Sequence, residues 1–249
     1  MRTIRQILNV TAFMTILPLG HDERLTPDDF GRFPAFYPLV GLTLGAILFL
    51  ARFVLDFCGF PPATEAVALV ALLVILTRGF HLDGIADTMD ALLSHRSLEE
   101  KLAILKDPHQ GTFGVLSIVL DIALKASLIH ACLSHPLGVT ALILFPAWGR
   151  LSTSVVAVFC RYARPSGGLG YYMVERSGAR ELFLALALAF LMSVWGGWPA
   201  LFSLLAAVAW GVALIFVWNK TLGGVTGDLL GSTTEISEIL TLLFFVLVF

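Results

Sequence analysis

Three aspartates follow a long apolar segment at helical spacing. Asp83, Asp87 and Asp90 stand at positions i, i+4 and i+7 of the stretch HLDGIADTMDA, which projects their carboxylates from one face of a helix. At about 6 Å and an effective dielectric of about 20, neighbouring carboxylates repel by roughly 2–3 kcal/mol. A divalent cation removes that repulsion, and carboxylate oxygens suit Mg²⁺. We expect a metal site here, with Gly84 leaving room for a substrate or another backbone; the alternative is a solvated acidic face.

A second polar stretch, ILKDPHQGTFG, lies further along the chain. Pro108 disfavours helix at the preceding Asp107, so a sharply turning loop is expected. Lys106 suits a phosphate contact, His109 can donate to phosphate or carry a proton, and Asp107 is a secondary metal ligand. The amides of the nearby glycines also suit phosphate. The alternative is a basic flank that only sets membrane orientation.

Two later loops carry further candidates. In RYARPSGGLGYY, Arg161 and Arg164 can grip phosphate, and the backbone of Ser166–Gly170 can offer N–H groups. The alternative is a basic anchor at the lipid interface, with its two tyrosines as belt residues. In GGVTGDLLGSTTEISE, Asp228 lies in a glycine-flanked turn and is a candidate ligand for metal or substrate. Glu235 either caps the last helix or belongs to the site.

Charges also lie inside apolar segments, where each costs about 2.5–3.5 kcal/mol at mid-membrane. Asp121 and Lys125 stand four residues apart and can form an internal ion pair. Arg150 has no partner in its own segment, so we expect it to link to the acidic cluster around Asp83. All three are candidate substrate contacts.

The elements that position these residues are membrane helices. Apolar residues make up 57% of the 249 residues and charged residues only 14%, against about 25% charged in a typical soluble domain. This composition excludes a soluble domain and a disordered chain, and three cysteines without a CxxC pair exclude a disulfide scaffold. A net charge of −2 gives no electrostatic support for a nucleic-acid partner.

We expect an all-α, polytopic transmembrane helix bundle that forms one integral membrane catalytic domain over residues 1–249. A spanning helix needs about 20 apolar residues, and seven segments approach that length. Ile7–Leu19 is shorter and is expected to be an interfacial or re-entrant helix. The expected spans are Pro38–Phe57, Ala63–Phe80, Gly114–Leu133, Leu137–Cys160, Leu182–Trp195, Pro199–Trp218 and Ile236–Phe249.

The loops between these spans fall into two sets. Cys58–Pro62, Ser134–Pro136 and Gly196–Gly197 are short and nearly uncharged, whereas the other connections are long. Of the 16 Lys and Arg, 13 lie in the long connections or at the N-terminus. The positive-inside rule places these segments, and every acidic motif in them, in the cytoplasm.

The motifs HLDGIADTMDA, LKDPHQGTFGV, the Gly149–Arg150 pair and GVTGDLLGSTTEISE, in that order, resemble those of the cobalamin synthase family, also called adenosylcobinamide-GDP ribazoletransferases. FMTILPLG and FPAFYPLVG are similar to it as well, so the resemblance covers nearly the whole chain. It implies that adenosylcobinamide-GDP and α-ribazole, or its 5′-phosphate, react to give a cobamide and GMP. It also implies Mg²⁺ and the bacterial inner membrane.

The implied reaction is substitution at a pyrophosphate phosphorus by a ribose hydroxyl. On this basis Asp83 and Asp87 are assigned to the metal, and Asp90 is either a third ligand or the base. The remaining candidates are Asp107 and Asp228 as secondary ligands, His109 as a proton carrier, and Lys106, Arg150, Arg161, Arg164, Asp121, Lys125 and Glu235 as substrate contacts.

Two other functions stay open at this point. CDP-alcohol phosphotransferases also place aspartates at the end of a span, but Phe80 stands where their first Asp would fall, and Asp87–Thr88 replaces their Ala-Arg pair. A transporter would use charges inside the membrane, but no internal repeat is seen. Oligomeric state is open too: a homo-oligomer and an assembly with other cobalamin-pathway enzymes both fit the sequence.

Overall fold

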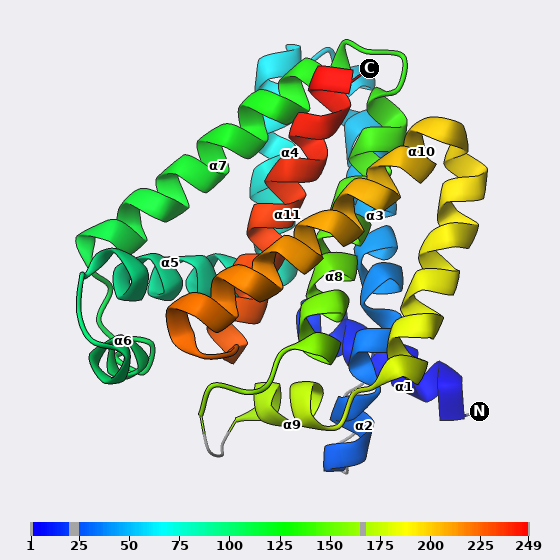
Figure 1. Ribbon diagram of the computed structural model, residues 1–249. Helices are drawn as coiled ribbons and strands as arrows, with labels where there is room; N and C mark the ends of the chain where they lie inside the picture. Colours follow the sequence, from blue (N-terminus) through cyan, green and yellow to red (C-terminus); the bar gives the residue numbers. More distant parts are fainter. Residues whose placement is uncertain (1, 20–24, 165–167, 249) are drawn as a thin grey trace.

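A computed structural model describes residues 2–19, 25–164 and 168–248 (Figure 1). All its regular elements in these ranges are helical, which confirms the all-α prediction. They are α1 (Arg2–Met14), α2 (Pro27–Gly31), the 3₁₀ helix η1 (Phe33–Phe36), α3 (Tyr37–Phe57), α4 (Pro62–Thr77), α5 (Phe80–Leu93), α6 (Leu98–Ile104), α7 (Thr112–Leu133), α8 (Gly138–Phe159), α9 (Leu169–Glu175), α10 (Ala179–Leu222) and α11 (Gly227–Val248).

Within the described ranges, five helices are long and apolar enough to cross a membrane, namely α3 with the preceding η1, α7, α8, α10 and α11. The count is six if α4 and α5, which meet at a 92° bend, are taken as one span. The chain is therefore a multi-pass membrane protein. Its helix α10 has 44 residues, about 66 Å at the α-helical rise, which is twice the thickness of a bilayer core.

Helix α10 turns back on itself at Gly197, whose backbone leaves the helical region (φ 70°, ψ −161°). The two arms run in opposite directions in Figure 1, as predicted for the fifth and sixth spans. Trp195 and Trp198 flank the turn with exposed side chains. The total of seven spans stays a prediction.

Helix α8 is the central element of the bundle. In the most apolar 18-residue window of α8, 89% of the window is buried inside the protein. The reason is that α3, α10 and α11 all pack against this helix. The approach of α3 depends on two glycines. A Cβ at Gly41 or Gly45 would collide with the α8 backbone at Pro146 or Ile143.

The elements outside the spans gather at one end. Helices α1, α2, α6 and α9 lie below the bundle in Figure 1, and the short connections and the C-terminus lie at the opposite end. This arrangement confirms the division of the loops into two sets. It brings the long, charged connections together, so residues distant in sequence can share one site.

Three predicted boundaries are corrected. Helix α1 spans Arg2–Met14 rather than Ile7–Leu19, and its 13 residues are still too few to cross a bilayer. Helix α4 ends at Thr77 and not at Phe80, because Arg78 and Gly79 adopt left-handed backbone angles. Helix α11 starts at Gly227 rather than Ile236, so most of the expected last loop is helical.

The contact between α3 and α8 gives a first prediction. We expect Gly45→Ala to destabilise the protein by about 1–3 kcal/mol, because the added methyl group overpacks a backbone contact. Ala46→Val is the matched control, since the neighbouring Ala46 side chain is exposed. The measurement is the melting temperature of both purified variants in detergent. Equal melting temperatures for the two variants would contradict the close approach.

Candidate active site

The site begins at the break between α4 and α5. Arg78 (φ 56°) and Gly79 (φ 65°) are both left-handed, which ends α4 and turns the chain by 92° into α5. A left-handed conformation costs a residue with a side chain about 1–2 kcal/mol. The Arg78 guanidinium donates to the carbonyl of Phe13 at 3.2 Å, and this bond ties the bend to α1.

Helix α5 carries the three predicted aspartates and lies across the ends of the spans (Figure 1). Its other face packs against α11. Gly84 makes this contact possible: a Cβ there would lie 2.6 Å from the carbonyl oxygen of Asp228, and Ser232 donates to the Gly84 carbonyl at 3.0 Å. The expected role of Gly84 is thus confirmed for a backbone neighbour, and this neighbour brings Asp228 to the aspartates of α5.

Asp90 has a structural partner at the start of α7. Its carboxylate accepts hydrogen bonds from the amides of Gly111 (2.7 Å) and Gly114 (2.8 Å). A Cβ at either glycine would collide with that carboxylate. These two amides, which we expected to contact phosphate, are therefore used by Asp90 instead.

Asp87 lies among the other carboxylates. It accepts a hydrogen bond of 2.8 Å from the Gln110 amide. Burial raises the pKa of Asp87 to about 6; the Gln110 bond opposes this rise, and the negative charges of Asp83, Asp228 and Asp90 add to it. The repulsion expected from the sequence therefore acts here, between helices as well as along α5.

Asp83 is the aspartate of this group whose carboxylate has the fewest hydrogen bonds. Its residue is exposed, and within the described part of the chain no hydrogen-bond donor reaches its carboxylate. The described residues contain no ready-made group of three His, Cys, Asp or Glu side chains for a metal ion. Both oxygens of the Asp83 carboxylate, and one oxygen of the Asp87 carboxylate, accept no hydrogen bond from a side chain among the described residues.

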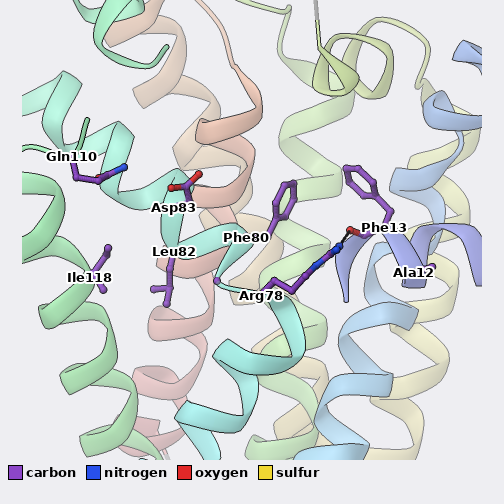
Figure 2. A pocket seen from close by; sticks show the side chains of 9 residues that line it. Ala12, Phe13, Arg78, Phe80, Leu82, Asp83, Gln110 and Ile118 are labelled. Atoms are coloured by element: carbon purple, nitrogen blue, oxygen red, sulfur yellow. Dashed lines mark hydrogen bonds between the residues drawn. The ribbon is translucent and has the colours of Figure 1, made fainter. Parts of the chain in front are cut away.

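Asp83 faces a broad hollow, here called the open cleft, with a volume of about 800 Å³. Figure 2 shows Asp83 and Gln110 toward one side and Arg78 and Phe13 toward the other. The cleft thus combines one guanidinium, one carboxylate and the Gln110 amide with mostly apolar side chains. Its lining residues are Ala12, Phe13, Arg78, Gly79, Phe80, Leu82, Asp83, Gln110 and Ile118.

A second hollow, here called the inner cavity, has a volume of about 330 Å³. It shares Phe13 and Phe80 with the open cleft, and these rings meet edge to face at a centroid distance of 5.5 Å. The ring pair therefore separates the two hollows. The inner cavity contains Arg164 and Asp228, whose charged groups lie 3.8 Å apart.

Several predicted residues lie in neither hollow. Lys106, Asp107 and His109 are exposed, and Asp107 accepts bonds from both the backbone amide (3.0 Å) and ring Nδ1 (2.7 Å) of His109. These bonds lower the pKa of Asp107. Arg161 is exposed and lines neither hollow. Ser166 and Gly167 lie outside the described residues.

Beneath the site, α7, α8 and α11 bury a cluster of charges, here called the ionic cluster. Lys125 contacts Asp121 (3.3 Å), Glu238 (2.7 Å) and Glu235, and Arg150 contacts Glu238 at 2.7 Å. Each of these five residues is at most 5% exposed. The cluster holds three carboxylates and two cations. The internal Asp121–Lys125 pair is confirmed as part of this larger network.

Two predictions about this region are wrong. Arg150 pairs with Glu238 and not with the aspartates of α5, and Glu238 was missed by the sequence reasoning. Glu235 does not cap a helix, because α11 begins at Gly227 and Glu235 lies inside it. The usable signal was the spacing of Glu235 and Glu238, which puts two carboxylates on one face of an apolar helix.

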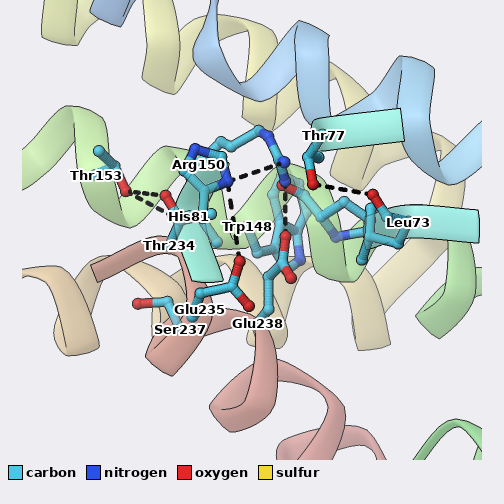
Figure 3. Close-up of polar contacts among 12 residues, drawn as sticks. Leu73, Thr77, His81, Trp148, Arg150, Thr153, Thr234, Glu235, Ser237 and Glu238 are labelled. Atoms are coloured by element: carbon cyan, nitrogen blue, oxygen red, sulfur yellow. Dashed lines mark hydrogen bonds and ion pairs between the residues drawn. The ribbon is translucent and has the colours of Figure 1, made fainter. Parts of the chain in front are cut away.

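His81 connects the ionic cluster to the inner cavity. It lines the cavity, and its Nδ1 lies 4.0 Å from Glu235 and 3.5 Å from Arg150 (Figure 3). A histidine on the turn before the first aspartate therefore fixes α5 to the bundle. None of the five residues of the ionic cluster lines either hollow.

Comparison with known proteins identifies the family of this chain. A family model described as cobalamin-5-phosphate synthase matches residues 6–246. The chain belongs to this family. The match includes the aspartates of α5, the residues of both hollows and the ionic cluster.

Known relatives match the chain over nearly its whole length and over nearly their own whole length. A protein of Desulfitobacterium hafniense is 38% identical over 98% of this chain and 97% of its own length. One of Acetivibrio thermocellus is 33% identical over 99% of both chains, and one of Pseudomonas aeruginosa is 36% identical over 94% and 95%. All three are named adenosylcobinamide-GDP ribazoletransferase. No solved structure matches the chain.

The ionic cluster gives a second prediction. We expect Lys125→Met to destabilise the protein by about 3–5 kcal/mol, because it leaves buried carboxylates without their cation. Arg96→Met is the control: it breaks the exposed Arg96–Glu100 pair, 3.2 Å long, and should change stability little. Thermal unfolding in detergent measures both. A Lys125→Met variant as stable as the control would show that the cluster does not depend on this charge.

Proposed function

We propose that this protein is a magnesium-dependent transferase that joins adenosylcobinamide-GDP to α-ribazole, or to its 5′-phosphate, and releases GMP. Family membership and the names of full-length relatives support this activity. The observation that carries the proposal is the open cleft at the junction of α1, α5 and α7, which Asp83 and the Arg78 guanidinium both line. The charge of Asp83 acts on neighbouring Asp87, so a pair of carboxylates lies at this cleft or beside it.

The donor set suits Mg²⁺. This ion is usually bound by one or two protein carboxylates, with waters and substrate phosphates as its other ligands. Asp83 and Asp87 would supply such a pair, and Asp228 is close enough to affect Asp87 electrostatically. When bound, the ion would neutralise charge on the pyrophosphate. A third protein ligand is not needed for this chemistry.

Other residues at the cleft would position the substrates and the metal-binding carboxylates. The Arg78 guanidinium is held by the Phe13 carbonyl and lies in the cleft, where it suits a phosphate oxygen. Gln110 holds Asp87 in place. Asp90 fixes the start of α7, which keeps Gln110 and Ile118 at the cleft; it also remains our candidate for accepting the hydroxyl proton.

We further propose that the protein lies in the bacterial inner membrane with the end that bears the cleft toward the cytoplasm. The concentration of Lys and Arg in the long connections supports this orientation. Nucleotide substrates are made in that compartment, so the cleft would meet them directly. Association with other enzymes of the pathway fits the exposed face but is not required by the site.

The direct test is an assay of the purified protein in detergent with three substrates. Adenosylcobinamide-GDP plus α-ribazole should yield GMP and the cobamide. A CDP-alcohol donor should yield no CMP, and liposomes containing the protein should show no corrinoid uptake. CMP release or uptake without GMP release would favour a lipid phosphotransferase or a transporter.

The role of Asp83 gives a third prediction. Asp83→Asn should abolish GMP release, because it removes the charge that holds the ion, while melting temperature stays unchanged since this side chain is exposed. Asp56→Asn is the matched control, because Asp56 is an exposed aspartate near the other end of the bundle. Retained turnover in Asp83→Asn would remove Asp83 from the metal site.

Metal removal gives a fourth prediction. EDTA should stop GMP release from the wild-type protein, and excess Mg²⁺ should restore it. Since the ion binds at the surface of α5 and not in the core, EDTA should leave the melting temperature of the substrate-free protein nearly unchanged. Full turnover in EDTA would contradict the magnesium proposal.

A further inference from the structure

We infer that the two hollows divide the substrates: the inner cavity takes the acceptor nucleoside, and the open cleft takes the pyrophosphate donor. This inference rests on the proposed function, which requires two substrates to meet at one phosphorus. It places each substrate in its own hollow. The Phe13–Phe80 ring pair lies at the boundary between the two hollows.

The two hollows differ in volume. Pockets for small ligands have volumes of about 300–1,000 Å³. The inner cavity, at about 330 Å³, is at the lower end and fits one nucleoside but not a corrinoid. The open cleft has about 800 Å³, and α1, α5 and α7 contribute to its walls. It is the hollow in which a nucleotide diphosphate tethered to a large group can lie.

The walls of the inner cavity fit an aromatic base. The rings of Phe13, Tyr37, Phe80 and Tyr162 line it, and the Tyr37 hydroxyl is already occupied by the sulfur of Met173 at 3.1 Å. An aromatic base gains affinity by stacking on aromatic side chains. The cavity therefore offers aromatic side chains on which the base of the acceptor can stack.

Two charged residues of the inner cavity fit a ribose or its phosphate. Arg164 and Asp228 lie there, and the buried Nε of Arg164 has no hydrogen-bond partner among the described residues. The Arg164 guanidinium donates to the Leu105 carbonyl at 3.2 Å, and its charge suits a hydroxyl or a phosphate oxygen in the cavity. Asp228 also lines the cavity and acts electrostatically on Asp87, so the polar part of the inner cavity lies near the carboxylates proposed to hold the metal.

The reaction then occurs where the hollows adjoin. A ribose hydroxyl of the acceptor attacks the phosphorus of the donor that bears the cobinamide. The new P–O bond forms, the phosphoanhydride P–O bond breaks, GMP leaves from the open cleft, and the hydroxyl proton is released. No oxidant or further reactant is needed.

One glycine allows a test. Gly227 lines the inner cavity and begins α11, and a Cβ there meets no atom within 4 Å. An added Cβ therefore enters open space at the cavity, and the longer Leu side chain would take up more of that space. We expect Gly227→Leu to raise the KM for α-ribazole by about tenfold or more, because even single methylene groups alter pocket affinity by such factors, and to leave the KM for adenosylcobinamide-GDP unchanged.

Binding of α-ribazole alone, measured by calorimetry without donor or turnover, should weaken in Gly227→Leu by the same factor. Gly227→Ala should show a smaller effect in both assays, which keeps the inference testable if the leucine variant folds poorly. Ala179→Leu is the control, because it adds the same side chain at the exposed first residue of α10 and should change neither constant.

Unchanged α-ribazole binding in both folded Gly227 variants, or a rise only in the donor KM, would overturn the assignment of the inner cavity. Failure of the proposed function would look different. In that case the wild-type protein itself would release no GMP from adenosylcobinamide-GDP and α-ribazole.

Discussion

The architecture depends on neutralising three carboxylates inside a membrane bundle. Asp121, Glu235 and Glu238 come from α7 and α11, and Lys125 and Arg150 must meet them there. A charged group is costly in the membrane unless it is paired, so the three helices that carry these residues have one register that satisfies all of them. The ionic cluster thus fixes α7, α8 and α11 relative to one another, and through His81 it fixes α5.

Backbone geometry then places the candidate site residues at one end of the bundle. Two left-handed residues, Arg78 and Gly79, turn α4 into α5, and the absence of a side chain at Gly84 lets α5 lie against the start of α11. These two features bring Asp83 and Asp87 to Asp228. Without these two features, the packing of the spans alone would not bring Asp83 and Asp87 close to Asp228.

Hydropathy and charge were sufficient to predict an all-α polytopic bundle with its short and long connections at opposite ends, because membrane helices must be long and apolar. They did not determine the number of spans or the boundaries of α1, α4 and α11. The helical spacing of Asp83, Asp87 and Asp90 was equally readable. Three features were not. The break at Arg78 requires a left-handed residue other than glycine, which no local pattern announces. Glu238 shares one face of α11 with Glu235, but its cationic partners Lys125 and Arg150 come from other helices. The segment TTE reads like a helix start, yet Thr233 donates to the Leu229 carbonyl at 2.7 Å inside α11.

The reversal of α10 at Gly197 has a consequence for the opposite end of the molecule. Its first arm, from residue 179 to 196, is about 27 Å long at the α-helical rise, close to the thickness of a bilayer core. Trp195 and Trp198 project outward at the tip, where indole rings settle among lipid headgroups. They would anchor the tip of α10 at one headgroup layer, and the length of the first arm then brings its beginning, at Ala179, close to the other headgroup layer.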